Sequence, residues 1–273
     1  MSRAYERLLC CGLSVIMVLS LGVLTSCNRE SESRIIVAGS TSVQPYAEIL
    51  AEAYNEHNPE IEIDIQGGGS SAGIIAVQTN TAEIGMSSRW LKDDEAGLYV
   101  VEIAKDGLAV IVHPSNPVIN LSLNQVRDIY CQNINNWNQV NGNDAQIHII
   151  AREDGSGTRS AFEELVMGRE KISPRAIVQD SNGAVRQLVA DDPNAIGFIS
   201  LGLVDIGERP VKALLLDGIA PSHENVVDGS YNLTRPFLFI IAAEPEGIIS
   251  DFVNFVLSEE GRRILRNEGL VAE

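Results

Sequence analysis

The sequence predicts an α/β protein in which mainly parallel strands are flanked by helices. Short apolar runs of strand length alternate along the chain with longer stretches of helical periodicity. Turns rich in glycine, serine and threonine join several of these strands to the helix that follows. This alternation is typical of layered α/β folds. With 273 residues, of which 45% are hydrophobic, the chain is long enough for one large domain or two ordinary ones.

The N-terminal residues differ from the rest of the chain. Arg3 and Arg7 precede an apolar run over 8–24, and small residues then lead into Cys27. A charged start, an apolar middle and a small-residue end predict a signal peptide over 1–26. The junction resembles a bacterial lipobox, so we expect Cys27 to carry lipid such as palmitate. An uncleaved membrane anchor is the alternative, because the apolar run is close to the shortest membrane span. Either way, the folded part is expected outside the cytoplasm and tethered to a membrane.

The first part of the folded region is predicted to form two strand–helix pairs. A polar tether over 27–33 leads to an expected strand at 34–38, which turns into an amphipathic helix at 43–56. Isoleucines alternate with acidic residues over 61–65, as in a strand with one buried face, and a helical stretch follows through 74–77.

The remaining elements follow the same pattern. Further strands are expected at 100–104, 108–113, 147–151, 196–199 and 211–216. Further helices are expected at 123–130, 159–166, 184–189 and 249–257.

Two breaks predict how the chain divides into lobes. Residues 113–117 form a stiff, proline-bounded break, and a polar stretch covers 222–232. If the chain crosses between lobes at both places, 34–117 together with 229–273 form lobe 1. Lobe 2 is then formed by 118–228.

Three segments place glycine, serine and threonine between an expected strand and an expected helix. They are 39–42, 67–71 and 154–158. A helix N-terminus presents free amide hydrogens and a positive dipole end, so it favours anions. Arg152 precedes the third segment, and its planar fork of donors suits a tetrahedral oxyanion. A fourth segment, 84–89, adds two hydroxyls and a guanidinium. For any one segment alone, ordinary helix capping is the alternative.

Charge and residue spacing exclude several other functions. A net charge of −17 argues against non-specific nucleic-acid binding, which needs a basic surface. A buried site can still bind an anion, because exposed charges are screened beyond ~8 Å at physiological salt. The Walker pattern of nucleotide-binding loops is absent from the sequence. The four histidines are scattered, and Cys131 is the single cysteine beyond Cys27, so neither a metal site nor a disulfide is expected.

An enzyme remains an alternative from the sequence. Residues 69–73 fit the Gly-x-Ser-x-Gly nucleophile elbow, with Ser71 as the nucleophile and His223 as a distant base. The two additional glycines before the motif and the two other Ser/Thr loops favour a loop that wraps a ligand. We therefore expect a binding protein rather than a hydrolase.

At these motifs the chain resembles the phosphate-binding proteins of bacterial ABC importers, over roughly residues 34–269. The segments that carry the resemblance are 38–43, 67–73, 84–89, 123–137, 152–159, 182–185 and 192–197.

The resemblance implies a two-lobed type II periplasmic-binding-protein fold that closes on one anion. It implies inorganic phosphate and the permease subunits of an importer as partners, a monomer, and no cofactor. Asp154 resembles the family carboxylate that orients the binding arginine. The ligand contacts that it implies are Thr41, Ser42, Ser70, Arg152, Ser156, Gly157 and Thr158.

One position departs from the better-known branch of that family. An aspartate there accepts the proton of hydrogen phosphate and so rejects sulfate, and the position that resembles it in this chain is Ser88. A hydroxyl does not repel a fully deprotonated dianion, so sulfate is the alternative ligand unless another acceptor such as Asp154 takes over this role. Arg89 either contacts the anion as well or pairs with a carboxylate. A non-transport role, as an adhesin or a phosphate sensor, would use the same fold.

Overall fold

A computed structural model describes residues 34–207 and 209–273 of the chain. The signal peptide and the tether that the sequence predicts, and Cys27, lie outside the described residues. Within the described ranges, no helix combines the length and apolar character that a membrane crossing needs.

The described chain alternates strands and helices. The strands are β1 (Arg34–Gly39), β2 (Glu62–Gly67), β3 (Ile84–Ser87), β4 (Tyr99–Val112), β5 (Asn120–Leu121), β6 (His148–Arg152), β7 (Ile177–Gln179), β8 (Ala195–Ser200), β9 (Lys212–Ala213), β10 (Leu215–Leu216) and β11 (Thr234–Ile241). The α-helices are α2 (Gln44–Asn55), α3 (Ser70–Gln78), α4 (Leu123–Tyr130), α5 (Gly157–Phe162), α6 (Asn182–Asp191), α7 (His223–Val227), α8 (Gly247–Leu257) and α9 (Glu259–Asn267). Short 3₁₀ or π turns lie at Asp93–Glu95, Trp137–Val140, Glu163–Met167 and Leu201–Leu203.

The main sheet of the described residues runs in the order β2-β1-β3-β11-β4-β8-β6-β7, with β9 paired to β4. β1 and β3 are parallel, as are β6 and its two neighbours β7 and β8. β4 and β11 pair with each other and with their outer neighbours in antiparallel fashion. Two groups of parallel strands are thus joined by one antiparallel pair.

Alternating side chains of the joining strands divide the core into layers. Phe237 and Phe239 of β11 belong to one hydrophobic cluster with α2, α8 and α9, whereas Leu238 packs with Ile74 of α3 on the opposite face. In β4, Val110 packs with α4 and α5, and Ile111 packs with α6. Helices therefore cover both faces of each half of the sheet, which confirms the predicted fold class of two α/β lobes.

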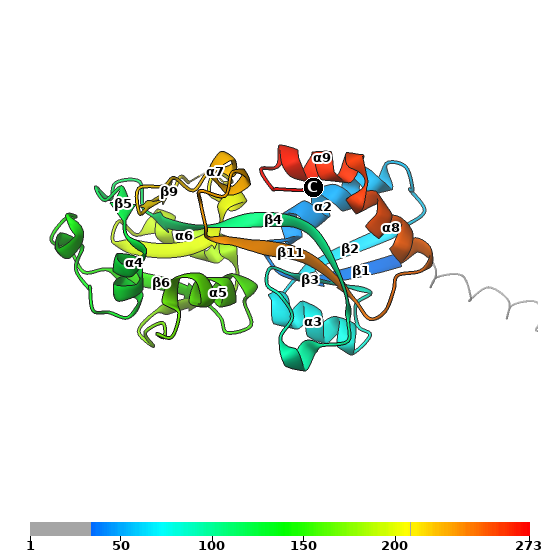
Figure 1. The fold of residues 1–273 in the computed structure, drawn as a ribbon, viewed down its shortest axis with the longest axis horizontal. Coiled ribbons are helices and arrows are strands. Elements are labelled where there is room, and N and C mark those ends of the chain that lie inside the picture. Colours follow the sequence, from blue (N-terminus) through cyan, green and yellow to red (C-terminus); the bar gives the residue numbers. More distant parts are fainter. Residues whose placement is uncertain (1–33, 208) are drawn as a thin grey trace, which may run out of the picture. The chain divides into compact units, whose positions relative to one another are not determined.

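β4 and β11 carry the chain between the two halves. The larger hydrophobic clusters draw on residues 35–104 with 237–272, and on residues 108–233. Figure 1 shows β4 and β11 running side by side from one group of elements to the other. The lobe limits expected from the sequence stay a prediction; within the structure, both clusters take residues from β4.

Local sequence explains several element boundaries. α4 begins after Ser122, whose hydroxyl accepts a hydrogen bond from the Gln125 backbone, while Gln125 Oε1 accepts one from the Ser122 backbone. Ser156, Ser181 and Ser258 cap α5, α6 and α9 in the same way, each by accepting a backbone amide proton.

Candidate functional site

The structure brings hydroxyls from all four sequence motifs into one buried cluster. Ser42 Oγ lies 2.9 Å from Thr158 Oγ1, although the two residues belong to different lobes of the expected division. The Ser88 backbone amide donates to Ser70 Oγ at 3.0 Å, and the two side-chain oxygens are 3.4 Å apart. All four side chains are buried. Residues far apart in the sequence therefore form one polar site.

Gly157 permits this close approach. A Cβ atom at residue 157 would lie 2.3 Å from Ser70 Oγ and 2.5 Å from Ser88 Oγ. A side chain there would collide with both hydroxyls, so the site requires glycine.

Two further predicted residues border the cluster in different ways. Thr41 Oγ1 accepts a hydrogen bond from Asn182 Nδ2 at 3.1 Å, and the same amide donates to Ser42 Oγ at 2.9 Å. Ser156 is buried, but its hydroxyl accepts from the Arg159 backbone at 3.2 Å and so caps α5. For Ser156 the structure therefore shows the capping role that the sequence left open.

Arg152 lies at the end of β6 and is 1% exposed. Its Nε and Nη2 each donate to the Glu153 carboxylate at 3.0 Å, and Nη2 also donates to the Asp180 carbonyl. Among the described residues, these are its side-chain hydrogen bonds. The guanidinium is thus fixed by neighbouring backbone and carboxylate oxygens, close enough to Arg235 for the two positive charges to interact.

The role expected for Asp154 needs a correction. Its carboxylate is exposed and pairs with Arg159 Nη1 at 2.8 Å, whereas Glu153 is the residue that holds Arg152. Glu153 directly follows Arg152, and its longer side chain reaches back to the guanidinium.

Arg89 pairs with a carboxylate. Its two terminal nitrogens donate to the two Glu95 oxygens at 2.7 Å each, and Nη2 also donates to Ser71 Oγ at 3.0 Å. This hydrogen bonding holds the pKa of Glu95 below its usual value of 4.5. Of the two roles left open by the sequence, the structure shows the ion pair.

Sequence reasoning missed a buried ion pair inside the cluster. Arg235 of β11 and Asp106 of β4 face each other in the strand register, and Asp106 Oδ2 accepts from Arg235 Nη2 at 2.9 Å. Arg235 also donates to Ser42 and Thr158. Burial lowers the pKa of Arg235, and the nearby positive charge of Arg152 lowers it further. Burial raises the pKa of Asp106, which the positive charge of Arg235 opposes.

The nucleophile elbow lacks a base in the described structure. Ser71 Oγ accepts from Arg89, and His223 Nδ1 lies 2.9 Å from the Gly269 carbonyl oxygen, so the two predicted partners make different contacts. The arrangement does not favour the hydrolase alternative. Within the described ranges no group of three or more histidine, cysteine or acidic side chains could hold a metal ion.

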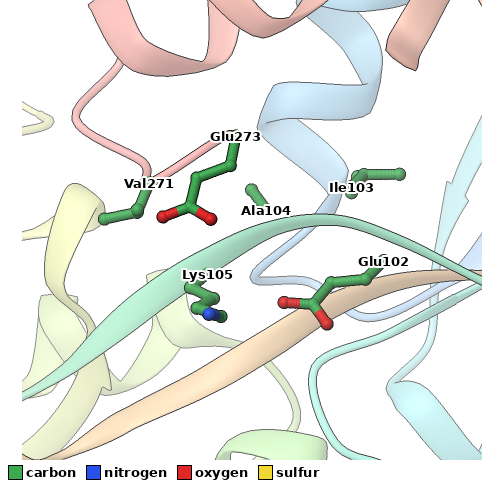
Figure 2. Close-up of a pocket in the computed structure, with 6 residues that line it drawn as sticks. All are labelled: Glu102, Ile103, Ala104, Lys105, Val271 and Glu273. Atoms are coloured by element: carbon green, nitrogen blue, oxygen red, sulfur yellow. The ribbon is translucent and has the colours of Figure 1, made fainter. Parts of the chain in front are cut away.

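A separate pocket of about 250 Å³ lies where β4 meets the C-terminal residues. Figure 2 shows Glu102 and Lys105 on β4 and the Glu273 side chain beside them. Two carboxylates against one ammonium group disfavour an anion. The hydroxyl cluster, with its buried arginines, is therefore the better candidate for an oxyanion site.

Buried hydroxyls and guanidinium groups between two α/β lobes are typical of a protein that binds a small polar solute. Comparisons with known proteins agree with this class. A family model described as a PBP superfamily domain matches residues 27–260. The chain therefore belongs to the PBP superfamily.

Solved and curated relatives narrow the comparison. A Clostridium perfringens protein, assigned to a phosphate ABC transporter as its substrate-binding protein and crystallised with bound phosphate, is 42% identical. It matches with a TM-score of 0.83 over 88% of this chain and 99% of that chain. A Vibrio cholerae ABC-type phosphate transport receptor is 37% identical, with a TM-score of 0.72 over 88% of this chain and 100% of that chain. The phosphate-binding protein PstS of Bacillus subtilis is 29% identical over 89% of this chain and 81% of its own length.

Proposed function

We propose that this chain captures inorganic phosphate outside the cytoplasm and delivers it to the permease of an ABC importer. The observation that carries the proposal is the convergence of Ser42, Ser70, Ser88 and Thr158 on one buried cluster with guanidinium groups beside it. Hydroxyls rotate to donate to an anion, and fixed guanidinium groups supply positive charge. The phosphate-bound relative supports phosphate as the ligand.

The same geometry supports binding without catalysis. Preorganised dipoles in a buried site hold charge without a full set of counter-ions. Closure of the two lobes about β4 and β11 would enclose the anion and give the permease a shape to recognise. We expect neither the wild-type protein nor Ser71→Ala to hydrolyse an ester substrate.

The test is phosphate binding by calorimetry to the wild-type protein and to Arg152→Ala. The variant should lose at least about tenfold in affinity, because the anion keeps its charge and loses a charged partner. Arg263→Ala removes an exposed arginine of α9 and serves as the matched control. Equal affinities for all three proteins would show that Arg152 does not contact the anion. A wild-type protein that binds no phosphate would contradict the proposed function.

Sulfate is the second candidate ligand, and Ser88 favours it. The carboxylate nearest to Ser88 through hydrogen bonds is Asp106, whose Oδ2 is already occupied by Arg235 and Ser200. A site with neutral hydroxyls, whose buried carboxylate is already paired with Arg235, has little to repel sulfate. We therefore expect sulfate to compete with phosphate at neutral pH, and competition calorimetry measures this directly.

The location of the protein also rests on Cys27. We propose that lipid on this residue anchors the mature, monomeric chain to the cell membrane. Cys27→Ser should move the protein from the membrane fraction to the soluble fraction, and an unchanged distribution would contradict the lipid anchor.

A further inference from the structure

The Arg235 guanidinium lies directly against three hydroxyls of the candidate site. Nη1 lies 2.7 Å from Thr158 Oγ1 and 3.5 Å from Ser88 Oγ, and Nη2 lies 3.0 Å from Ser42 Oγ. The side chain is 4% exposed. One buried cation thus contacts three of the four segments that the sequence predicts to surround an oxyanion.

Asp106 fixes which edge of that guanidinium faces the hydroxyl cluster. Its Oδ2 accepts from Arg235 Nε at 3.0 Å and from Nη2 at 2.9 Å, and it also accepts from Ser200 Oγ at 2.8 Å. The carboxylate therefore takes the Nε side of the planar group. Nη1 points toward Thr158 and Ser88, and Nη2, which Asp106 shares, also donates to Ser42. The two terminal nitrogens thus face the hydroxyl cluster in a fork geometry that matches a tetrahedral oxyanion.

We propose that Arg235 is a second arginine ligand of the bound oxyanion and that Asp106 is the residue that positions it. The inference rests on the proposed function and deepens it. The hydroxyls of Ser42 and Thr158 accept from Arg235 and can donate their own protons to the anion. Two guanidinium groups then face the ligand, and a neutral hydroxyl stands at Ser88. Two positive groups and a neutral hydroxyl together favour a tetrahedral anion that carries two negative charges.

The decisive experiment compares Arg235→Gln with Asp106→Asn, using calorimetry with inorganic phosphate. Arg235→Gln should weaken phosphate binding about 10- to 100-fold, the effect of removing a charge-assisted donor. Asp106→Asn removes a negative charge beside the anion but keeps a side-chain oxygen that accepts from Arg235, so Arg235 stays positioned and phosphate affinity should be equal or higher. A pair that only held the two strands together would lose affinity in both variants alike. Loss in both variants would therefore overturn the inference.

Two further variants keep the test interpretable. The double variant Asp106→Asn/Arg235→Gln leaves no unpaired buried charge, so it remains testable if Arg235→Gln fails to fold. It should bind phosphate more weakly than wild type, and wild-type affinity would overturn the inference. Arg263→Gln makes the same substitution at an exposed arginine and should bind normally.

The failure of this inference is distinguishable from the failure of the proposed function. Wild-type protein that binds neither phosphate nor sulfate overturns both. Wild-type protein that binds phosphate while Arg235→Gln retains full affinity overturns the role of Arg235 alone. A larger phosphate-induced rise in melting temperature for Asp106→Asn than for wild type supports the role, because the ligand then neutralises an otherwise unpaired buried cation.

Discussion

The buried arginines Arg235 and Arg89 pair with carboxylates that differ in their exposure to solvent. Asp106 is 2% exposed and accepts from both Arg235 and Ser200 through Oδ2, whereas Glu95 lies nearer the surface and holds both terminal nitrogens of Arg89. Two-point contacts of this kind fix a guanidinium plane as well as its position. The arginines of the site region are thus oriented before any ligand arrives.

The Arg89–Glu95 pair makes stability depend on pH in a defined direction. The pKa of Glu95 is lowered below 4.5 by its hydrogen bonds to Arg89, so the folded protein binds fewer protons there than the unfolded chain. The pair's contribution is complete above pH 4.5 and is lost as pH falls through the lowered folded-state pKa. Glu95→Gln should cost about 2 kcal/mol of unfolding free energy at neutral pH.

Urea unfolding of wild type and Glu95→Gln as a function of pH measures this effect. The difference should shrink toward zero at the acid end, where Glu95 in the wild type is protonated. Glu260→Gln is the matched control, because Glu260 and Arg263 form an exposed pair with 4.0 Å between Oε1 and Nη2. Its unfolding free energy should differ little from that of wild type at any pH. If the difference in unfolding free energy between wild type and Glu95→Gln stays constant with pH, the ion pair with Arg89 is not its cause.

Close contact between backbones positions α3, the element that carries Ser70. A Cβ atom at Gly73 would lie 2.4 Å from the Ala38 carbonyl oxygen and 2.8 Å from Gly39 Cα. A Cβ atom at Gly85 would lie 2.8 Å from the Gly73 carbonyl oxygen. α3 therefore rests directly on β1 and β3, and the position of Ser70 depends on the absence of side chains there.

Gly73→Ala should lower the unfolding free energy by about 1–3 kcal/mol and weaken phosphate binding, because α3 must move off the sheet. Gly183→Ala in α6 is the matched control, since a Cβ there meets nothing within 4 Å. It should be neutral or stabilising by less than about 1 kcal/mol. Thermal unfolding with and without phosphate measures both effects, and equal behaviour of the two variants would contradict the packing explanation.

The elements show what the sequence could and could not predict. The helix expected at 123–130 is α4 to the residue, because Ser122 and Gln125 form a complete capping box. The strands expected at 100–104 and 108–113 are one strand, β4, since the polar residues between them include Asp106, which Arg235 neutralises. α9 was not expected, and it presents few apolar residues.

The candidate site was predictable where a short motif carries it. Ser42, Ser70, Ser88 and Thr158 each belong to a recognisable glycine- and hydroxyl-rich segment. Arg235 does not, because its role depends on the pairing of β11 with β4, whose facing residues Arg235 and Asp106 are 129 positions apart. Polar residues within two otherwise apolar strand sequences are the signal that could have indicated this pair.

At the scale of the whole molecule, the net charge opposes the proposed ligand. The chain carries −17 at neutral pH, while the site itself is buried and locally basic. The long-range field repels an approaching anion, whereas the short-range contacts that hold it are shielded from solvent.

Added salt should therefore speed phosphate association. Raising ionic strength with sodium chloride screens the long-range repulsion, so the association rate should rise and the dissociation rate should change little. Stopped-flow measurement of phosphate binding across a salt series separates the two rates. An association rate that falls with salt would indicate that local positive charge dominates the approach.

The use of β4 and β11 by both halves also has a consequence for the order of folding. The cluster built on 108–233 comes from one continuous stretch, whereas the cluster built on 35–104 needs β11, α8 and α9, which are the last elements in the chain. The core of the N-terminal half thus cannot close until the C-terminal elements are present. The segment nearest the N-terminus therefore completes its core only with the last elements of the chain.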